Sequence, residues 1–509
     1  MKLTSSKIPT IDLFAGPGGL SEGFWRTGKY DICLSIEKDY WAHETLRLRA
    51  FFHQFDRASV PDDYYEFVAG RMSQSELYEL HPEEFGKADA EAYHAELGSD
   101  AFPKDIVDTR IRAALEASES KEWLLIGGPP CQAYSLVGRA RRHKDPEFIK
   151  DPKHILYKQY LRIIAEHKPT VFVMENVTGI LTSRLQGEKI FPRICKDLQN
   201  PGQALNINKD TQYQLFSLRE GVSDDASVLA WNYVLKAEDY GIPQARHRVI
   251  VVGVRADVAV KPGKMTEVHP GTTVWDVIGD IPKLRSKLSK EEDGSTQWVT
   301  ALRAMTERSW FGDIKNRQVK EKLCANLQSL SFTLQTSGGG LRKSGARSQL
   351  CEMLRDSHVP VPPNHESRGH MRSDLWRYLY ASTFAKVCHR SPTIRDFPKG
   401  LWPNHTNLDN SGGNPIFGDR FHVQLRNKPS STVMAHISKD GHYYIHPDPS
   451  QCRSLTVREA ARLQTFPDNY LFLGPRTEQF RQVGNAVPPL LAQKIADAVY
   501  AVFDKYNET

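Results

Sequence analysis

Residues 11–24 read IDLFAGPGGLSEGF, an apolar run that passes through a cluster of glycines into a helix-compatible stretch. The pattern predicts a strand, a tight turn and the start of a helix, because glycine lets the backbone turn sharply and approach a ligand closely. An acidic residue, Glu37, ends the next apolar run. An acid about 20 residues beyond such a turn can bind both hydroxyls of a ribose. The segment therefore predicts a nucleoside cofactor, the alternative being a plain strand-to-helix turn.

Short apolar runs recur up to residue 255 and are separated by longer polar or helical stretches. They read PTIDLF, DICLSIE, WLLIGG, TVFVMEN and RVIVVGVR. This alternation predicts an α/β domain in which helices cover both faces of a parallel sheet. An acidic and aromatic stretch at about 50–102 reads as inserted helices.

The βα rhythm is lost in the second half of the chain. Residues 262–452 gather glycine, proline, asparagine and histidine without a clear period, which predicts a second, smaller, loop-rich domain. Regularity returns afterwards, and residues 488–503 place apolar side chains on one helical face. We therefore expect residues 1–261 and 453–509 to form one discontinuous domain around the second.

The composition is that of an ordinary globular protein, with 509 residues, 40% hydrophobic and 25% charged. No run approaches the roughly 18 apolar residues of a membrane span, and the first residues lack the apolar region of a signal peptide. We expect a cytoplasmic, nucleoid-associated protein with no membrane partner. The seven cysteines form no CxxC pair, so neither a disulfide framework nor a zinc site is expected.

Positive charge is concentrated in residues 281–450. This stretch holds 25 Lys and Arg against 15 Asp and Glu, whereas the rest of the chain holds 42 against 46. It also holds nine of the 18 histidines. The imbalance favours a polyanionic partner, the alternative being a solvated basic surface.

A cysteine stands at the end of one expected strand, in the segment LLIGGPPCQAYSLVGRARR. Two prolines fix the backbone directly before Cys131, at the sheet edge where open α/β proteins bind their ligands. This setting favours a nucleophile over an inert buried thiol. Ser135, Arg139 and Arg141 follow in a basic loop suited to closing over a phosphate backbone.

Two further strand ends carry polar groups. The run TVFVMEN ends in Glu175, and apolar surroundings would raise the pKa of such a carboxyl and let it donate a proton near neutral pH. The run GIPQARHRVIVVGVR places Arg246 and Arg248 on one side, beside Gln244. Guanidinium groups in this arrangement can grip a carbonyl oxygen or a phosphate, although each alone could equally be an ion-pair partner.

Six motifs in order resemble the DNA (cytosine-5) methyltransferase family, of the bacterial or phage, restriction-modification-like type. They read FAGPGG, GPPCQ, ENV, QARHR, RSLTVREAARLQTFPDNY and VGNAVPPLLAQKIA. The resemblance implies a Rossmann-like S-adenosylmethionine-dependent methyltransferase domain with a target-recognition domain. It also implies a monomer that acts on double-stranded DNA and is functionally paired with a cognate restriction endonuclease.

The same resemblance implies S-adenosyl-L-methionine as the cofactor. Glu37 would bind its ribose, Asp105 and Ile106 would read its adenine, and Asn485 with Val487 would close the pocket from the C-terminal side. Its methionine part would lie among the residues of the glycine turn, which are Phe14, Gly16, Pro17, Gly18, Gly19 and Leu20.

The family mechanism assigns a role to each catalytic residue. Cys131 would attack carbon 6 of cytosine, because carbon 5 alone is a poor nucleophile. Glu175 would bond ring nitrogen 3, and Arg248, with Arg246 beside it, would assist at the carbonyl of carbon 2. The cytosine must first leave the base stack, which costs a few kcal/mol.

The resemblance places sequence recognition in the basic segment. Thr432 and Val433 look like the family's pair that contacts the target, and Thr333 with Leu334 is the weaker candidate. Two other functions remain open. One is a tRNA methyltransferase of the same fold, whose usual Cys-Phe-Thr signature we do not find; the other is a non-catalytic DNA-binding regulator.

One position departs from the family. Lys38 follows Glu37, where relatives often carry a bulky apolar residue, and Trp41 is a nearby substitute for packing on the adenine.

Overall fold

The computed structural model divides the chain into two compact units. Unit 1 comprises Met1–Tyr64, Gln74–Gly271 and Ala486–Thr509, and unit 2 comprises Tyr65–Ser73 and Thr272–Asn485. The structure describes residues 7–118, 120–130, 152–185, 188–219, 230–330, 336–403 and 418–506.

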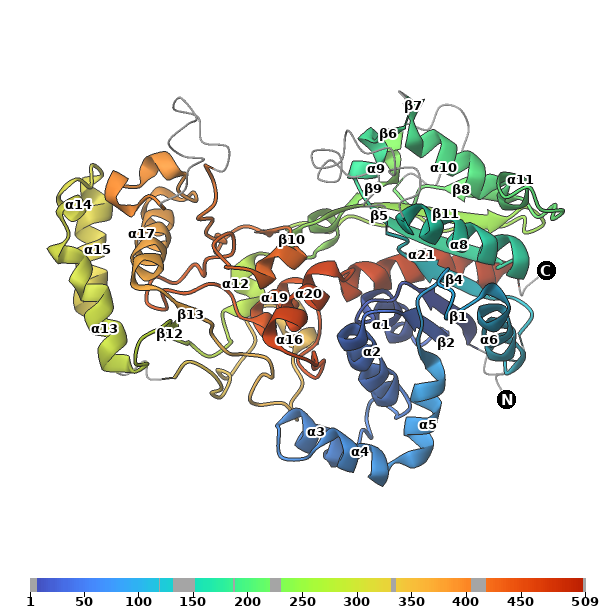
Figure 1. Ribbon diagram of the computed structural model, residues 1–509, viewed down its shortest axis with the longest axis horizontal. Coiled ribbons are helices and arrows are strands. Elements are labelled where there is room, and N and C mark those ends of the chain that lie inside the picture. The colour runs from blue at the N-terminus through green and yellow to red at the C-terminus, as the bar shows by residue number, and fades with distance from the viewer. Residues whose placement is uncertain are drawn as a thin grey trace. The chain divides into compact units, whose positions relative to one another are not determined.

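An eight-stranded sheet forms the core of unit 1 (Figure 1). Its strands are β1 Ile8–Leu13, β2 Tyr30–Glu37, β3 Ala92–His94, β4 Leu124–Gly127, β5 Val171–Val177, β8 Tyr213–Phe216, β9 Val234–Lys236 and β11 His247–Arg255. They run in the order β3-β2-β1-β4-β5-β11-β8, and β9 also pairs with β11. The first five in this order are parallel, whereas β11 is antiparallel to all its neighbours. The α/β class is confirmed, but the sheet is mixed rather than wholly parallel.

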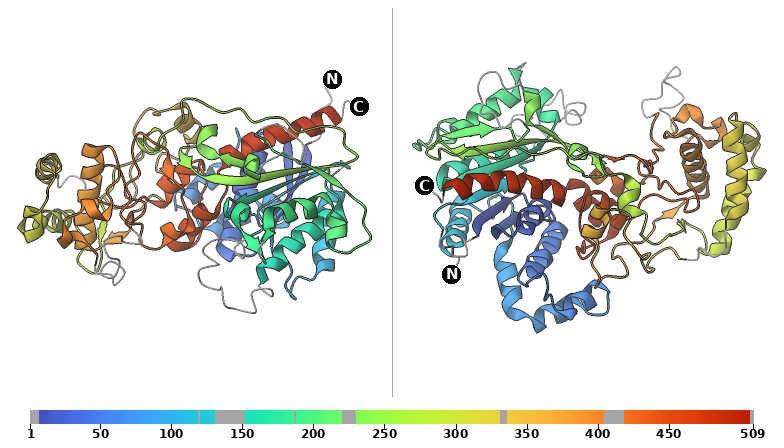
Figure 2. Two further views of the ribbon diagram at one scale, coloured as in Figure 1. Left: turned by 90° about the horizontal axis from the view of Figure 1, so that it is seen from above. Right: turned by 180° about the vertical axis from the view of Figure 1, so that it is seen from behind.

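Helices cover both faces of this sheet. The helices α1 Gly19–Arg26 and α21 Pro489–Tyr506 pack on one face, and Figure 2 shows α21 lying along it. The helices α6 Lys104–Glu116, α8 Pro152–His167 and α10 Ile190–Gln199 pack on the other. Successive residues of β11 alternate between the two layers, with Val251 facing the second and Val252 the first.

The expected insert is helical, as predicted. It contains the end of α2 Tyr40–His53, followed by α3 Asp62–Val68, α4 Gln74–Leu80 and α5 Pro82–Glu91. The remaining short elements of unit 1 are α9 Gly179–Thr182, β6 Arg184–Leu185, β7 Glu188–Lys189, α11 Pro201–Ala204, η3 Ala230–Tyr233, η4 Ala237–Tyr240 and β10 Gln244–Ala245.

Unit 2 contains more helix than its sequence suggests. Its helices are α12 Val274–Ile278, α13 Ser295–Arg303, α14 Ser309–Gly312, α15 Arg317–Ser329, α16 Gln349–Leu354, α17 Arg372–Cys388, α19 Val457–Leu463 and α20 Arg476–Asn485. Short strands and 3-10 turns join them: β12 Lys287–Leu288, η5 Ala304–Glu307, β13 Gly369–His370, η6 Ile394–Asp396, η7 Lys399–Leu401, β14 Ser430–Ser431 and η8 Ala435–Ser438. A separate core around α13, α15 and α17 includes Trp298, Leu323 and Leu379.

The boundary expected at residue 453 is displaced, because unit 1 resumes only at residue 486. The cause is α19, whose buried arginines bond to backbone carbonyls of unit 2. Arg458 donates to Pro363 and Arg462 to Val277. The apolar face predicted for residues 488–503 is confirmed, since these side chains are buried in α21. Among the helices of the described residues, none is long and apolar enough to cross a membrane.

Candidate active site

The carboxyl ends of β1, β4 and β5 meet at one edge of the sheet. Leu13 in β1 pairs with Gly127 in β4, which also pairs with Met174 in β5. Three predicted motifs leave the sheet at this edge: the glycine turn, the Gly-Gly-Pro-Pro turn and the Glu-Asn pair. Open α/β sheets bind their ligands beyond such an edge.

The glycine turn is bonded to the end of β2. Phe14, Gly16 and Gly18 have φ of 59°, 58° and 91°, the left-handed region that favours glycine. The N–H of Gly16 donates to Oε2 of Glu37 at 2.8 Å, and Oε1 of Glu37 accepts from the N–H of Lys38. Burial raises the pKa of Glu37, while these backbone bonds act in the opposite direction. The turn and the acid predicted to share a cofactor are therefore in direct contact.

The start of α1 is open to a ligand. Gly18 precedes the helix and provides no side-chain cap, which leaves the N–H groups of Gly19 and Leu20 for another acceptor. A Cβ built on Gly16 meets no heavy atom within 4 Å. A helix N-terminus attracts anions, so this cradle fits the carboxylate of an amino-acid ligand.

The C-terminal segment closes against the same helix. A Cβ on Gly19 would lie 2.2 Å from the carbonyl oxygen of Val487, and one on Gly23 would lie 2.4 Å from the Cβ of Ala492. Glycine is therefore required at both positions for α21 to reach α1. Asn485, the last residue of α20, is exposed and directly precedes this segment.

A buried carboxyl lies before the glycine turn and was not anticipated. Asp12 in β1 is fully buried, and Ser21 in the first turn of α1 interacts with its carboxyl. Burial raises its pKa well above the usual value, and hydrogen bonds with Ser21 act in the opposite direction. Nothing in the apolar run that contains Asp12 distinguishes it from a strand residue that faces solvent.

A second acid overlooked in the sequence lies beside the end of β2. The strand β3 runs parallel to β2, with His94 opposite Glu37. Two residues beyond His94, Glu96 forms an ion pair with Lys38 at 2.8 Å, and the two side chains are about half exposed. This acid could not be recognised from its position in the sequence, because the long insert separates β2 from β3.

The two residues predicted to read the adenine lie on a helix rather than at a strand end. Asp105 and Ile106 occupy the first turn of α6, and both are exposed. The structure thus offers Glu96 as another acid, at the end of the strand that neighbours β2.

A carboxylate and a guanidinium face one another on β5 and β11. Oε1 of Glu175 lies 2.7 Å from Nε of Arg248, which also donates through Nη1 to the carbonyl of His247. A Cβ on Gly128 would lie 2.8 Å from Oε2 of Glu175, so the chain leaving β4 passes directly over this carboxylate. Desolvation lowers the pKa of Arg248, and Glu175 opposes that effect. Glu175 therefore faces a guanidinium in addition to the apolar surroundings expected for it.

The neighbouring asparagine holds the turn that carries the cysteine. Nδ2 of Asn176 donates to the carbonyl of Pro129 at 3.0 Å, and both groups are buried. Cys131 itself lies outside the described residues, as do Ser135, Arg139 and Arg141. The described geometry ends at Pro130, one residue before the predicted nucleophile.

The profile of the family described as C-5 cytosine-specific DNA methylase matches residues 83–501. The chain belongs to this family. The methylase is 34% identical over 519 residues to the type II methyltransferase M.Bpa9945I of Bacillus paralicheniformis, across 98% of this chain and 99% of the relative. It is 26% identical over 541 residues to the DNA (cytosine-5-)-methyltransferase M.ApeKI of Aeropyrum pernix, across 98% and 99%. It is thus a DNA (cytosine-5-)-methyltransferase of the restriction-modification type.

A solved structure shares the fold of the methylase. It is described as a prophage-encoded DNA modification methyltransferase of E. coli, with a TM-score of 0.51 and 20% identity over 98% of this chain and 100% of that one. The likeness supports the Rossmann-like methyltransferase fold predicted from the motifs.

Two residues predicted beside Arg248 are buried in the methylase. Gln244 and Arg246 are 0% and 1% exposed. The N–H of Arg246 donates to the carbonyl of Gln244, and its own carbonyl accepts from Ala237. Arg246 therefore supports the turn before β11, whereas Arg248 presents its guanidinium at the strand edge.

The pair predicted to contact the target divides between core and surface. In unit 2 of the methylase, Val433 is fully buried, and the carbonyl of Thr432 accepts from the Tyr444 hydroxyl at 2.9 Å. Met434, the next residue, is 48% exposed. Thr432 and Met434 are thus the residues of this segment with side chains open to solvent. The weaker candidate pair at residues 333–334 lies outside the described residues.

Proposed function

We propose that this methylase transfers a methyl group from S-adenosylmethionine to carbon 5 of a flipped-out cytosine within a particular sequence of duplex DNA, with Cys131 as nucleophile. The contact between Glu175 and Arg248 carries the proposal. It joins two ligand-binding groups at 2.7 Å, directly beneath the chain that leads to the cysteine.

Cys131 would form a bond to carbon 6 of the cytosine, and the electron pair displaced from the 5,6 double bond would make carbon 5 nucleophilic. After methyl transfer, loss of the carbon 5 proton restores the double bond and expels the thiolate. The bond from Asn176 to Pro129 supports this role, because it fixes the turn two residues before Cys131. A nucleophile held on a rigid turn loses little entropy when it attacks.

Glu175 and Arg248 would bind the pyrimidine edge. Arg248 engages one carboxyl oxygen of Glu175 and leaves the second free to carry a proton, which it would donate to the acceptor at ring nitrogen 3. Arg248, whose three guanidinium nitrogens can bond separate acceptors, would meet the carbonyl of carbon 2. Both contacts strengthen as charge develops on the ring during attack.

The residues around the glycine turn fit S-adenosylmethionine, which when bound supplies the methyl group on its sulfonium. The uncapped N–H groups of α1, at Gly19 and Leu20, would bind its carboxylate. Glu37 would bind the ribose hydroxyls, since its two oxygens retain acceptor capacity beyond the backbone bonds. Glu96 beside Lys38 would meet the adenine edge, with Asp105 as the alternative acid.

Duplex DNA would be held by the basic segment of residues 281–450, with its 25 Lys and Arg against 15 Asp and Glu. Phosphate contacts there would help to offset the few kcal/mol needed to extrude a base. A restriction-modification role and a partner endonuclease would follow from the type II relatives.

A tritiated-methyl transfer assay on duplex DNA and on tRNA tests the activity. We expect incorporation into DNA alone; incorporation into tRNA alone, or into neither, would refute the proposal. A duplex containing 5-fluorocytosine traps the covalent intermediate, and digestion should map the adduct to Cys131. Methylation mapping of DNA from cells that express the chain would identify the recognised sequence.

A further inference from the structure

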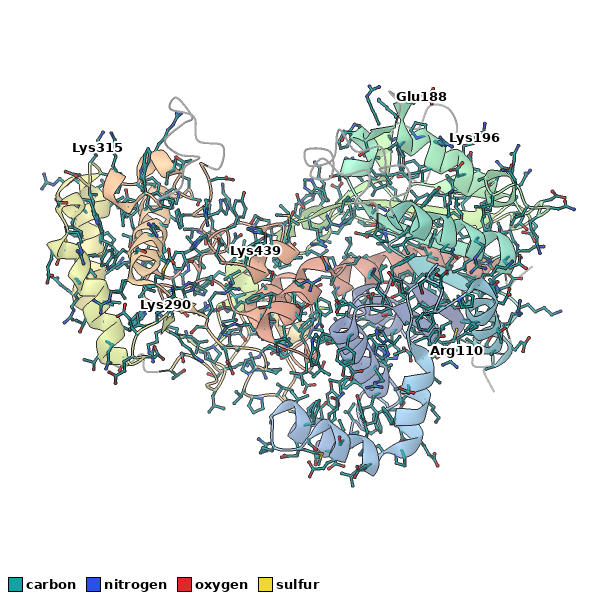
Figure 3. All side chains as sticks on the ribbon, in the orientation of Figure 1. Arg110, Glu188, Lys196, Lys290, Lys315 and Lys439 are labelled. Carbon is teal, nitrogen blue, oxygen red and sulfur yellow. The ribbon has the colours of Figure 1, made fainter. Side chains whose placement is uncertain are left out.

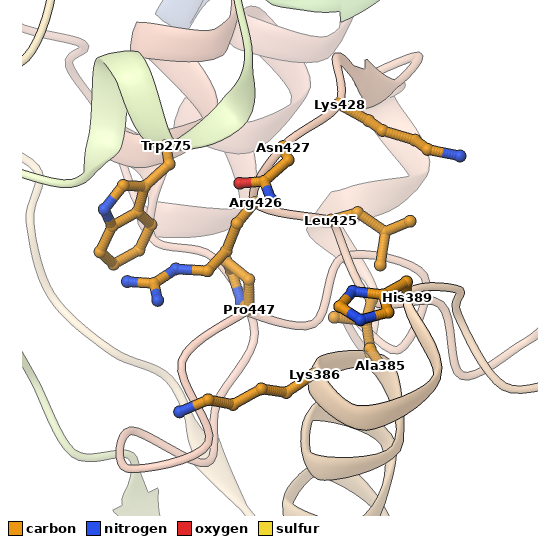
Figure 4. A pocket seen from close by; sticks show the side chains of 10 residues that line it. Trp275, Ala385, Lys386, His389, Leu425, Arg426, Asn427, Lys428 and Pro447 are labelled. Carbon is orange, nitrogen blue, oxygen red and sulfur yellow. The ribbon is translucent and has the colours of Figure 1, made fainter.

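Unit 2 contains a pocket of about 380 Å³ that the catalytic steps do not use (Figure 4). It is lined by Trp275, Ala385, Lys386, His389, Val423, Leu425, Arg426, Asn427, Lys428 and Pro447. The N–H groups of Val274 and Trp275 donate to the carbonyls of Lys428 and Arg426. These bonds fix one wall of the pocket against α12, so the pocket is a built part of the fold.

The pocket is strongly basic. Lys386, His389, Arg426 and Lys428 contribute nitrogen groups, and no Asp or Glu is among its described lining residues. In Figure 4 the nitrogen ends of Lys386 and Arg426 extend in the same direction, whereas Lys428 points the opposite way. Both cations can thus face an anion that enters from that side, and the planar guanidinium of Arg426 can bind a phosphate through two parallel bonds.

An aromatic ring orients the central arginine. The guanidinium of Arg426 lies 3.5 Å from the centre of the Trp275 ring, within the range of a cation–π contact. Its Nε is buried and has no hydrogen-bond partner among the described residues. Stacking fixes the plane of the guanidinium while its donors remain available to an acceptor that enters the pocket.

Neighbouring groups compensate this charge only in part. A second guanidinium, that of Arg347, lies 5.4 Å from the same ring. The acid that acts on Arg426, Asp448, is engaged by Lys283 at 2.9 Å and by the hydroxyl of Ser450 at 2.8 Å. The local excess of positive charge would thus be stabilised by an anion bound from solution.

We infer that this pocket binds a phosphodiester of the DNA backbone and anchors the duplex without reading its sequence. The inference rests on the proposed function. A backbone phosphate projects from the duplex and can enter a pocket, whereas base edges lie within the grooves. The wall residues 423–428 lead within a few positions to Thr432, so the anchor would position the duplex beside the predicted target contact.

Salt-dependent DNA binding by the full chain tests the inference. Fluorescence anisotropy would be measured with two mixed-sequence duplexes of unrelated sequence, for wild type, Lys386→Ala and Arg426→Ala. Each lost phosphate contact should reduce the slope of log K against log salt by about 0.9. We expect affinity for both duplexes to fall by the same factor. Lys196→Ala is the control, an exposed lysine of α10 outside the basic segment, and should leave the slope unchanged (Figure 3).

Three results would overturn the inference. They are an unchanged slope in both pocket variants, an equal loss in Lys196→Ala, and a loss confined to one of the two sequences, which would indicate base reading. Because Arg426 is partly buried, thermal unfolding would be followed in parallel, and the exposed Lys386→Glu variant should weaken binding more than Lys386→Ala. Binding is measured without turnover. A lack of methyl transfer would therefore refute the proposed activity, whereas the binding measurements would still test the phosphate pocket on their own.

Discussion

Nε of Arg248 lies 2.7 Å from Oε1 of Glu175, and the two side chains are only 12% and 14% exposed. Charges so shielded from water interact strongly, and removing one partner leaves the other uncompensated. Glu175→Gln keeps the shape and removes the charge. We expect it to lower kcat by about 10²–10⁴-fold, the range for a lost acid–base group, with little change in DNA affinity. Single-turnover methyl transfer measures this, and a near-normal rate would contradict the assigned role.

Cys131→Ala should abolish methyl transfer and leave DNA binding intact, because only the covalent step needs the thiol. Cys33→Ala is the matched control. Burial raises the pKa of Cys33 to about 12, so this thiol stays protonated and unreactive. Methyl-transfer assays and anisotropy on both variants would show whether only the loss of Cys131 stops methyl transfer. Turnover by Cys131→Ala would contradict its assignment as the nucleophile.

Gly19→Ala should weaken binding of S-adenosylmethionine and destabilise unit 1 by about 1–3 kcal/mol, because its Cβ would meet the Val487 carbonyl at 2.2 Å. Gly86→Ala lies in α5 with nothing within 4 Å of the new Cβ. This control should instead stabilise the protein by about 0.5–1 kcal/mol. Calorimetric titration and thermal unfolding would compare them; equal behaviour would contradict the close packing of α21 on α1.

Acid should destabilise unit 2. Burial lowers the pKa of His365 to about 4 and that of His446 to about 3. An unfolded histidine titrates near 6.5, so below about pH 6.5 the unfolded state binds more protons, and stability falls towards pH 4 by up to about 1.4 kcal/mol per pH unit for each histidine. Urea unfolding at a series of pH values measures this slope. His446→Gln should reduce it, and a flat profile would be inconsistent with neutral buried rings.

Unit 1 should respond less to acid. Burial lowers the pKa of His53 to about 4 but raises the pKa values of Asp12 and Glu91 well above their usual range. The folded state therefore retains protons on these acids that the unfolded state releases, which opposes the histidine contribution. An unfolding probe specific to each unit would resolve the difference.

Arg458→Met should destabilise unit 2 by about 2–5 kcal/mol, because three buried carbonyls lose their donor. These carbonyls belong to Pro363, Pro467 and Tyr470. Arg481→Met removes an arginine that is 49% exposed and paired only with Glu478 among the described ion pairs, and should cost about 0–1 kcal/mol. Denaturant unfolding of the two variants would test this, and equal losses would exclude a structural role for the buried network.

The glycine turn, Glu37 and the strand ends were predictable from sequence, because the apolar pattern of a strand and the residues of a turn are local properties. The contact between Glu37 and the N–H of Gly16 joins two residues of the same sequence motif, whose separation of about 20 residues is part of that motif. Glu96 was not predictable in the same way. It follows β3, and the helices of the insert separate β3 from β2 in the sequence.

The organisation of unit 2 was harder to predict. The helix α17 shows no apolar face because it is buried on nearly every side, including Asp374, Ser382 and Thr383. The placement of α19 depends on bonds from Arg458 and Arg462 to carbonyls about 95 and 185 positions away in the chain. Nothing in the local sequence shows where such long-range partners lie.

The packing of α21 against α1 also has a consequence during synthesis. Gly19 and Gly23 are translated directly after β1, whereas Val487 and Ala492, which close upon them, are translated after every strand of the described sheet. A nascent chain can complete its sheet and still lack a finished cradle for the methyl donor. A nonsense or frameshift mutation before α21 should therefore yield an inert product rather than a weakened enzyme, so modification begins only after translation has passed α21.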